Sequence, residues 1–558
     1  MNNKKAVKTI KSEVVTEYVA PTRIVAVSEN IVRPQVLVTN RHTQVYQNEK
    51  DFAFCKGKGY VILDFGTELH GGVRIITYHC GPRNEGRVRL RFGESVGETC
   101  AEIGEKNATN HHSVRDMEVL LPNLSDQTFG KTGFRFLRID FIEPDEEYLL
   151  LNVYAASTAR AEKGVGRFSC GDKLINRIYD VARYTLFLNM QDNLYEGIKR
   201  DRLVWVGDMQ PEVLAITYIF GKHPLVEKGL SESVEHCPLP AWFGSIACYS
   251  GWLIRIVYDY YMKVKNTRFV LDMMPYMEGV IRQIGECVDE EGNIDFSRSA
   301  APNREVVFFD WPTNGTPDAL EGNRFVFIMA AEAMKTLRSC VGIGNSADCD
   351  VLLAKLRKPV QKRVTAKQVV ALGYLTGRIS AADAAELLSA GGAKGISSFM
   401  SYFIFTAAAE TCGTETALRW LKEYYGGMIS RGATTFWEDF DVSWLEGSGR
   451  IDEFPAEGIK DIHGDFGAYC YRGFRHSLCH GWSCGPVQFL TEKVLGVKVL
   501  KAGCEEIEIS PSLGGLKRCR GVFPTPFGNV KIYHENKDGK ITSRVTAPQG
   551  VKIVIKEN

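Results

Sequence analysis

The most informative stretch of this 558-residue chain is Glu196-Gly197-Ile198-Lys199-Arg200-Asp201-Arg202-Leu203-Val204-Trp205-Val206-Gly207-Asp208. It brings three carboxylates, three cations and a tryptophan into thirteen positions. Its glycines and the polar run 199–202 break helical spacing, so it is predicted to be a loop. Such crowding is compatible with a structural ion-pair network and with a catalytic pocket, in which arginines hold carboxylates ionised and a tryptophan face supports a sugar ring.

A second group of residues favours the catalytic pocket over the ion-pair network. Gly432-Ala433-Thr434-Thr435-Phe436-Trp437-Glu438-Asp439-Phe440-Asp441 again places a carboxylate beside a tryptophan, and Trp444 and Glu446 follow. Glycoside hydrolysis in its commonest form uses two carboxyl groups, one as acid and one as base or nucleophile. The two stretches offer a candidate for each.

These motifs resemble those of the bacterial α-L-rhamnosidases of glycoside hydrolase family 78. The first stretch is similar to their catalytic loop, and 432–438 is similar to their Gly-Ala-Thr-Thr-apolar-Trp-Glu motif. Two further matches are Phe309-Asp310-Trp311 and His480-Gly481-Trp482-Ser483-Cys484-Gly485-Pro486. The flanks are similar as well, at Arg91-Phe92-Gly93-Glu94-Ser95 and Pro524-Thr525-Pro526-Phe527-Gly528. The resemblance covers nearly the whole chain.

The periodicity of the chain changes twice. Short alternating runs between Tyr60 and Tyr154, such as 60–65, 72–78, 86–92 and 134–141, separated by Gly, Asn, Asp and Pro turns, predict an antiparallel β-sandwich. Amphipathic helices are predicted at 172–184, 250–265, 268–288, 319–341, 380–388 and 416–425. Strands return at 506–509, 530–533 and 551–555, in about 65 residues that would form only a marginal core alone. We therefore expect this segment to pack on the helices.

The resemblance implies how these regions are organised. The expected fold class is multidomain α plus β, with a central (α/α)6 barrel flanked by an N-terminal antiparallel β-sandwich and a small C-terminal β-sandwich. The expected domains are 1–163, the N-terminal sandwich with a leading extension; 164–493, the catalytic barrel; and 494–558, the C-terminal sandwich.

The general acid has two candidates. Asp201 falls where the family commonly carries a glutamate acid, and aspartate is one methylene shorter, so its carboxyl would lie about a bond length back. Glu196, five residues upstream, also falls near a family carboxylate. Because a general acid must keep its proton near neutral pH, we expect at least one of the neighbouring arginines to pair with another carboxylate, Asp208 being the obvious one.

The resemblance implies that Glu438 is the general base of an inverting enzyme, with a cap or helix ion pair as the alternative for this residue. Arg202, Asp208, Asp310 and His480 are predicted to bind sugar hydroxyls. Tryptophans are predicted to wall the pocket and to suit the methyl group of a 6-deoxy sugar, although any one of them could instead belong to the core: Trp205, Trp311, Trp437, Trp444 and Trp482.

Composition is that of a globular enzyme. The net charge of +1 and the absence of a basic block exclude nucleic acid as the expected partner. Met1–Lys8 is not followed by an apolar core, and no run approaches the about 20 apolar residues of a membrane span, so a cytoplasmic location without membrane contact is predicted. The fifteen scattered cysteines are expected to be unpaired thiols. The sequence contains no phosphate-binding loop, dinucleotide fingerprint or EF-hand-like loop, so neither a cofactor nor a metal is predicted, and calcium dependence stays open.

The sequence therefore predicts an exo-acting α-L-rhamnosidase that releases terminal rhamnose from an oligosaccharide or plant glycoside. A homodimer is one oligomeric state that is compatible with the sequence. Two alternatives stay open: a barrel glycosidase for another sugar, and a carbohydrate-binding homologue impaired in turnover by the aspartate at 201.

Overall fold

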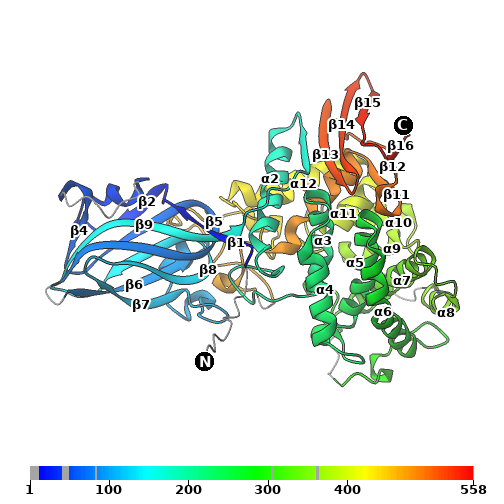
Figure 1. Ribbon diagram of the computed structural model, residues 1–558, viewed down its shortest axis with the longest axis horizontal. Coiled ribbons are helices and arrows are strands. Elements are labelled where there is room, and N and C mark those ends of the chain that lie inside the picture. The colour runs from blue at the N-terminus through cyan, green and yellow to red at the C-terminus, as the bar shows by residue number, and fades with distance from the viewer. Residues whose placement is uncertain are drawn as a thin grey trace, which may run out of the picture.

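A computed structural model describes residues 12–40, 49–81, 84–302, 307–359, 364–469 and 471–556. The segment Met1–Lys8, on which the prediction of no secretory signal rests, lies outside these ranges. The chain is a mixed α and β structure of several regions: an N-terminal antiparallel sheet, a helical region, and two smaller C-terminal sheets beside the helices (Figure 1).

The N-terminal region is a nine-stranded antiparallel sheet whose main path runs β3-β4-β9-β5-β8-β6-β7, with β1 on β9 and β2 on β5. Its own apolar core includes Val61, Leu63, Val73 and Leu137. Its elements are β1 Val14–Val19, β2 Arg23–Val27, β3 Ile31–Val32, β4 Ala53–Lys56, β5 Gly59–Cys80, β6 Glu85–Gly93, α1 Val96–Cys100, β7 Asp116–Pro122, β8 Asp126–Phe141 and β9 Glu147–Arg160.

One prediction for this sheet is wrong. The runs 60–65 and 72–78 are not two strands separated by a turn, because both belong to the 22-residue β5. Its pairing with β8 shifts register between Asp64 and Leu69 and again between Gly71 and Val73. Gly66 and Gly71 have positive φ angles of 80° and 148°, so the glycines bend one strand instead of ending it.

The helical region contains every predicted amphipathic helix. Its α-helices are α2 Lys173–Asn189, α3 Met209–Ile219, α4 Pro224–His236, α5 Ala247–Val264, α6 Thr267–Cys287, α7 Pro317–Cys340, α8 Ala347–Leu356, α9 Lys367–Leu375, α10 Ala381–Ser389, α11 Ser401–Ala408, α12 Thr414–Ser430 and α13 Gly485–Phe489. Helix α3 gave no amphipathic signal because all eleven of its residues are buried. None of the helices within the described ranges is long and apolar enough to cross a membrane.

The C-terminal strands pack on the helices, as expected. Ile507, Phe523 and Val530 share one continuous apolar core with residues of the helical region. The four-stranded sheet has the order β10-β13-β14-β15 and the three-stranded sheet the order β11-β12-β16, in which β12 and β16 are parallel. One of these strands, β10 Arg167–Cys170, comes from the segment just before α2. The C-terminal strands are β11 Val497–Lys501, β12 Glu506–Ile509, β13 Arg518–Thr525, β14 Gly528–Lys537, β15 Lys540–Thr546 and β16 Lys552–Ile555.

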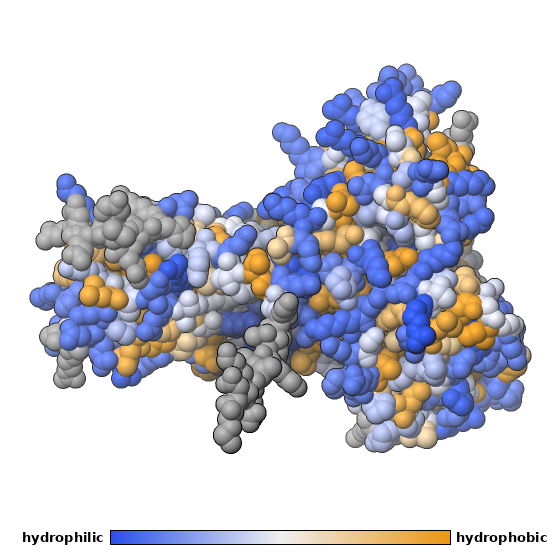
Figure 2. Space-filling model, viewed as in Figure 1, coloured by the Kyte–Doolittle hydropathy of each residue, from blue (hydrophilic) through white to orange (hydrophobic). Residues whose placement is uncertain are grey.

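The surface and the thiols fit a globular protein. The face in Figure 2 is mostly hydrophilic, with small scattered hydrophobic groups. The fourteen cysteines within the described ranges are all free, which confirms the predicted absence of a disulfide framework for them.

Candidate active site

The predicted loop 196–208 connects α2 to α3 and lies against a distant part of the chain. Gly197 and His480 form an isolated antiparallel bridge, and the Gly481 N–H donates to the Glu196 carbonyl at 2.7 Å. A Cβ at position 481 would lie 1.6 Å from Oε1 of the buried Glu212, so a side chain there would require the Glu212 side chain to move. Two of the sequence motifs are thus adjacent in space.

The Glu196 carboxylate shapes the tip of this loop. It accepts hydrogen bonds from the Arg202 N–H at 2.9 Å and the Leu203 N–H at 2.8 Å. Asp201 and Arg202 have φ angles of 53° and 56°, a left-handed conformation that costs non-glycine residues about 1–3 kcal/mol. Burial, with Asp208 and Asp201 nearby, raises the pKa of Glu196 well above its usual range. Glu196 therefore holds a strained tip in place.

The second motif packs beside the fourth. The Glu438 N–H donates to the Ser477 carbonyl at 3.0 Å, and the His480 N–H donates to the Phe436 carbonyl at 3.0 Å. The Trp482 indole donates to the Glu438 carbonyl, also at 3.0 Å. The backbone around Glu438 is therefore fixed from several sides.

These loops surround a cavity of about 300 Å³, at the small end of the range for ligand pockets. All three predicted catalytic residues line it: Glu196, Asp201 and Glu438. So do five of the predicted binding residues, Trp205, Asp208, Trp311, His480 and Trp482. The cavity joins carboxylates to aromatic walls, as a sugar pocket requires.

Glu438 is a buried carboxylate paired with a cation. Arg200 Nη2 donates to its Oε1 at 2.5 Å, and the Ser477 N–H donates to its Oε2 at 3.2 Å. Burial outweighs these contacts and raises the pKa of Glu438 to about 7. A base that titrates there can accept a proton near neutral pH.

Asp208 and Glu438 approach the same imidazole. His480 Nε2 lies 3.4 Å from Glu438 Oε1 and 3.9 Å from Asp208 Oδ2. Burial lowers the pKa of His480 well below its usual range, so the ring is neutral and offers one donor and one acceptor. The Tyr249 hydroxyl donates to Asp208 at 2.9 Å, and burial raises the pKa of Asp208 to about 8. These groups suit sugar hydroxyls.

The arginine that the sequence assigned to Asp208 is found elsewhere. Arg200 is paired with Glu438 and also lies 3.9 Å from Asp201. Arg202 turns to the N-terminal region, where its guanidinium donates to the Lys131 and His112 carbonyls. An arginine thus pairs with another carboxylate, as expected, but the choice of Asp208 was wrong, because Arg200 reaches Glu438 and Arg202 reaches backbone carbonyls of the N-terminal region.

Asp201 is the most exposed of the three predicted catalytic side chains. It is about a quarter exposed, and His112 Nδ1 of the N-terminal region lies 2.9 Å from its Oδ1. His112 is not among the site residues predicted from the sequence. The structure makes His112 a direct neighbour of a candidate acid.

Four predicted binding residues lie outside the lining of this cavity. Arg202 is described above. Asp310 caps a short 3-10 helix, accepting from the Trp311 N–H at 2.8 Å and the Ser397 hydroxyl at 2.5 Å. Trp437 is fully buried, and Trp444 stacks on Phe466 with ring centroids 5.7 Å apart. For both tryptophans, the core alternative left open by the sequence fits their surroundings.

The cavity also contains residues that were not predicted. Tyr249, Phe308, Asn314, Tyr471 and Arg475 line it, and the Arg200 guanidinium lies 4.7 Å from the centroid of the Tyr471 ring. Phe308 directly precedes the Phe309-Asp310-Trp311 motif and could have been found by extending it. The others carry no local signal because their chemistry arises only from packing.

Two other polar features belong to different parts of the molecule. A larger hollow of about 740 Å³ lies between α6, α7 and α8, away from the four motifs, and Glu278, Arg338 and Asp348 are among its lining residues. Within the described ranges, Glu94, Glu98 and His463 form the one group of three potential metal ligands. The Lys199 ammonium lies among them, 2.9 Å from Glu94 and 3.1 Å from Glu98.

Comparison with known protein families gives a match for the first part of the helical region. Residues 163–338 match the model of the bacterial alpha-L-rhamnosidase 6 hairpin glycosidase domain. No match exists among curated proteins.

Solved structures share the fold at low sequence identity. The GH78 family rhamnosidase of Bacillus sp. GL1 aligns with a TM-score of 0.73 and 20% identity over 94% of this chain and 55% of that one. The rhamnosidase from Klebsiella oxytoca with rhamnose bound aligns with a TM-score of 0.65 and 18% identity over 86% of this chain and 95% of that one. The Streptomyces avermitilis alpha-L-rhamnosidase complexed with L-rhamnose aligns with a TM-score of 0.71 and 14% identity over 97% of this chain and 50% of that one. The chain thus spans about half the length of two of these three proteins.

Proposed function

We propose that this chain is an exo-acting α-L-rhamnosidase, because residues 163–338 match the model of the bacterial alpha-L-rhamnosidase 6 hairpin glycosidase domain. Its substrate would be a terminal α-L-rhamnose on an oligosaccharide or plant glycoside. The observation that carries the proposal is the about 300 Å³ cavity, in which Glu438 faces Asp201 across Arg200 between aromatic walls.

Glu438 is the proposed general base. Glu438 lines the cavity, and burial raises its pKa to about 7. The Arg200 and Ser477 donors orient it, so a water beside its free lone pairs could be deprotonated as it attacks the anomeric carbon. Attack by water opposite the leaving group gives inversion of configuration.

Asp201 is the proposed general acid, and Glu196 is proposed to support it. An acid must reach the glycosidic oxygen, which in an exo-acting enzyme lies toward the open side of the pocket. Asp201 is partly exposed there, whereas both Glu196 oxygens are occupied by backbone N–H groups. His480 and Asp208 would bind hydroxyls of the rhamnose ring at the base of the pocket.

The finer architecture is part of the same proposal. The helices from α2 onward would form the (α/α)6 barrel over 164–493, with sandwich domains over 1–163 and 494–558. Glycosidase loops at one end of such a barrel would account for the convergence of 196–208, 432–441 and 477–482 on one cavity. The cytoplasmic location and a homodimer stay predictions from the sequence.

Proton NMR of the hydrolysis of an aryl α-L-rhamnoside tests the function. We expect β-L-rhamnose to be the first product, followed by mutarotation, and Glu438→Gln to abolish its release. First release of the α-anomer would contradict inversion. If the wild-type protein cleaves another glycoside in a panel but no rhamnoside, the substrate assignment fails while the hydrolase assignment stands.

A further inference from the structure

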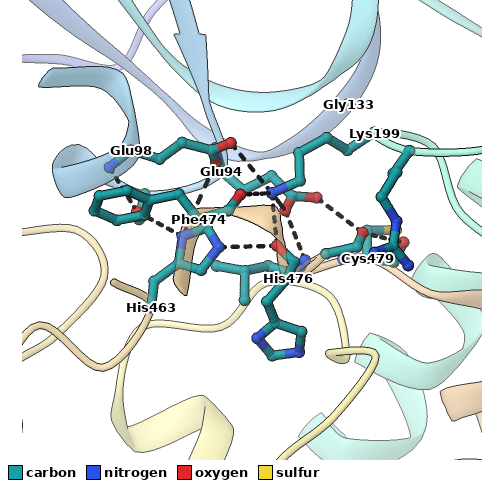
Figure 3. A network of polar contacts seen from close by, with 12 residues as sticks. Glu94, Glu98, Gly133, Lys199, His463, Phe474, His476 and Cys479 are labelled. Carbon is teal, nitrogen blue, oxygen red and sulfur yellow. Dashed lines mark hydrogen bonds and ion pairs between the residues drawn. The ribbon is translucent and has the colours of Figure 1, made fainter. Parts of the chain in front are cut away.

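A buried polar network surrounds the side chain of Lys199, a residue of the loop 196–208 (Figure 3). Its centre is the Lys199 ammonium, which contacts the Glu94 and Glu98 carboxylates and donates to the Phe474 carbonyl at 3.0 Å and the His476 carbonyl at 2.6 Å. Lys199 is less than a tenth exposed, and both glutamates are fully buried. An ammonium in such a place has exchanged its water shell for four protein oxygens.

The network joins three segments that are far apart in the sequence. Glu94 and Glu98 come from the N-terminal region at the end of β6 and in α1, and Lys199 comes from the catalytic loop. The third segment is 463–480, whose carbonyls Lys199 binds. Lys199 is also fixed by its backbone, since its carbonyl accepts from the Ser113 hydroxyl at 2.9 Å.

Neutral groups also belong to the network around Lys199. His463 Nδ1 lies 2.8 Å from the Ser95 hydroxyl, and its Nε2 lies 2.9 Å from the His476 carbonyl. Burial, with Lys199 nearby, lowers the pKa of His463 well below its usual range, so the ring adds no charge. The Lys199 ammonium is therefore the cation that the Glu94 and Glu98 carboxylates contact.

Two short paths lead from this network to Glu438. Along the chain, Lys199 is followed by Arg200, whose guanidinium holds Glu438 Oε1. Through space, Glu94 accepts from the Leu478 N–H at 2.6 Å and the Ser477 hydroxyl at 3.3 Å. The Ser477 N–H in turn donates to Glu438 Oε2. Both donors that orient the carboxylate thus depend on segments fixed by Lys199.

We infer that Lys199 is a positioning residue, an internal cation that holds the N-terminal region, Arg200 and Ser477 in the arrangement that orients Glu438. This inference rests on the proposed function for its kinetic readout. It extends the active site into the N-terminal region, because the carboxylates that Lys199 needs come from Glu94 and Glu98.

Lys199→Met tests the inference, since methionine keeps an unbranched apolar side chain and removes the charge. The matched control is Lys367→Met: Lys367 is similarly buried, and its ammonium binds the Gly392 carbonyl and the Trp420 ring, neither of which belongs to the network. We expect kcat of Lys199→Met to fall at least about 10-fold while KM changes less than about threefold, because a misplaced base costs turnover rather than binding. The control should keep both constants.

A pH profile separates positioning from a merely structural role. Loss of a nearby positive charge makes Glu438 easier to protonate, so the acidic limb of kcat/KM should move to higher pH in Lys199→Met and stay in place in the control. The other charged and titratable groups around Glu438 are the same in Lys199→Met and in the control: Arg200, Asp201, Asp208, Asp439 and His480. A Lys199→Met protein with lowered thermal stability but normal kcat and an unmoved limb would overturn the inference.

Two measurements keep the test independent of folding and of the proposed function. If Lys199→Met does not fold, Glu94→Gln replaces it, and a normal kcat in that folded variant would count against the network. If the wild-type protein hydrolyses no rhamnoside, the proposed function fails by itself. The inference is then judged from the carboxyl 13C signal of Glu438, assigned by its absence in Glu438→Gln, which should titrate at higher pH in Lys199→Met than in Lys367→Met.

Discussion

Arg200 and Glu438, 238 positions apart in the sequence, form a buried ion pair in which Arg200 Nη2 lies 2.5 Å from Glu438 Oε1. The same guanidinium lies 3.9 Å from Asp201. One arginine thus connects the proposed base to the proposed acid. It favours the ionised form of Glu438, which burial opposes, and the balance leaves the pKa of Glu438 at about 7.

Removal of the proposed base should abolish turnover without unfolding the protein. Glu438→Gln keeps the shape of the side chain, and we expect kcat to fall at least about 100-fold, as for loss of a general base. Initial rates with an aryl α-L-rhamnoside measure this, and circular dichroism reports the fold. Near-normal activity in a folded variant would refute the assignment.

The pH dependence of the wild-type enzyme should have its acidic limb near pH 7. A base acts only when ionised, and burial raises the pKa of Glu438 to about 7, so kcat/KM should fall as pH decreases through that value. Initial rates between pH 5 and 9 at low substrate concentration measure the limb. A limb near the ordinary glutamate value of about 4.3 would contradict the proposed environment of this carboxylate.

Leaving-group dependence should distinguish Asp201 from Glu196. An acid variant loses most with poor leaving groups, because good ones depart without a proton. We expect Asp201→Asn to be far slower on a methoxyphenyl rhamnoside than on a dinitrophenyl rhamnoside, relative to the wild-type enzyme. Glu196→Gln, which weakens the loop tip, should reduce both rates by similar factors. The opposite pattern would make Glu196 the acid.

A cavity tryptophan should matter for binding and a core tryptophan should not. Trp311 lines the cavity, whereas Trp444 lies outside its lining. We expect Trp311→Ala to raise KM about 10-fold, the loss of roughly one aromatic contact with the sugar. The matched Trp444→Phe should keep KM within about twofold. Equal KM values in all three proteins would remove Trp311 from the binding surface.

Asp208 should make the folded protein less stable as pH rises. Burial raises the pKa of Asp208 to about 8, while the unfolded chain titrates at about 3.9. Between these values Asp208 binds more protons in the folded state than in the unfolded state. The contribution of Asp208 to the free energy of unfolding is therefore complete below about pH 4 and is lost as pH rises toward 8. Asp208→Asn cannot ionise there and should lose this part of the decline.

Thermal unfolding at pH 5 and pH 8 measures the effect. We expect the decrease in midpoint between these pH values to be smaller by a few degrees in Asp208→Asn than in the wild-type protein. Asp180→Asn, at an exposed position on α2, is the control and should follow the wild-type slope. Parallel slopes in all three proteins would show that Asp208 is already ionised in the folded state.

The sequence by itself determined the local structure and the inventory of reactive groups. Alternation and helical spacing gave the N-terminal strands and the amphipathic helices, because these patterns depend on residues a few positions apart. Where the pattern was absent, as in the fully buried α3, or was interrupted by glycines, as in β5, the prediction failed or was incomplete. The identities of Glu196, Asp201 and Glu438 as cavity carboxylates were also predictable from their motifs.

Only the tertiary structure decided which groups meet. That Arg200 pairs with Glu438, that His112 lies beside Asp201, and that Lys199 lies between Glu94 and Glu98 depends on how distant loops pack. The same packing buries Trp437 and leaves Trp311 at the cavity. The physical reason is that ion pairing and burial are set by separation in space, which the sequence spacing of these residues does not encode.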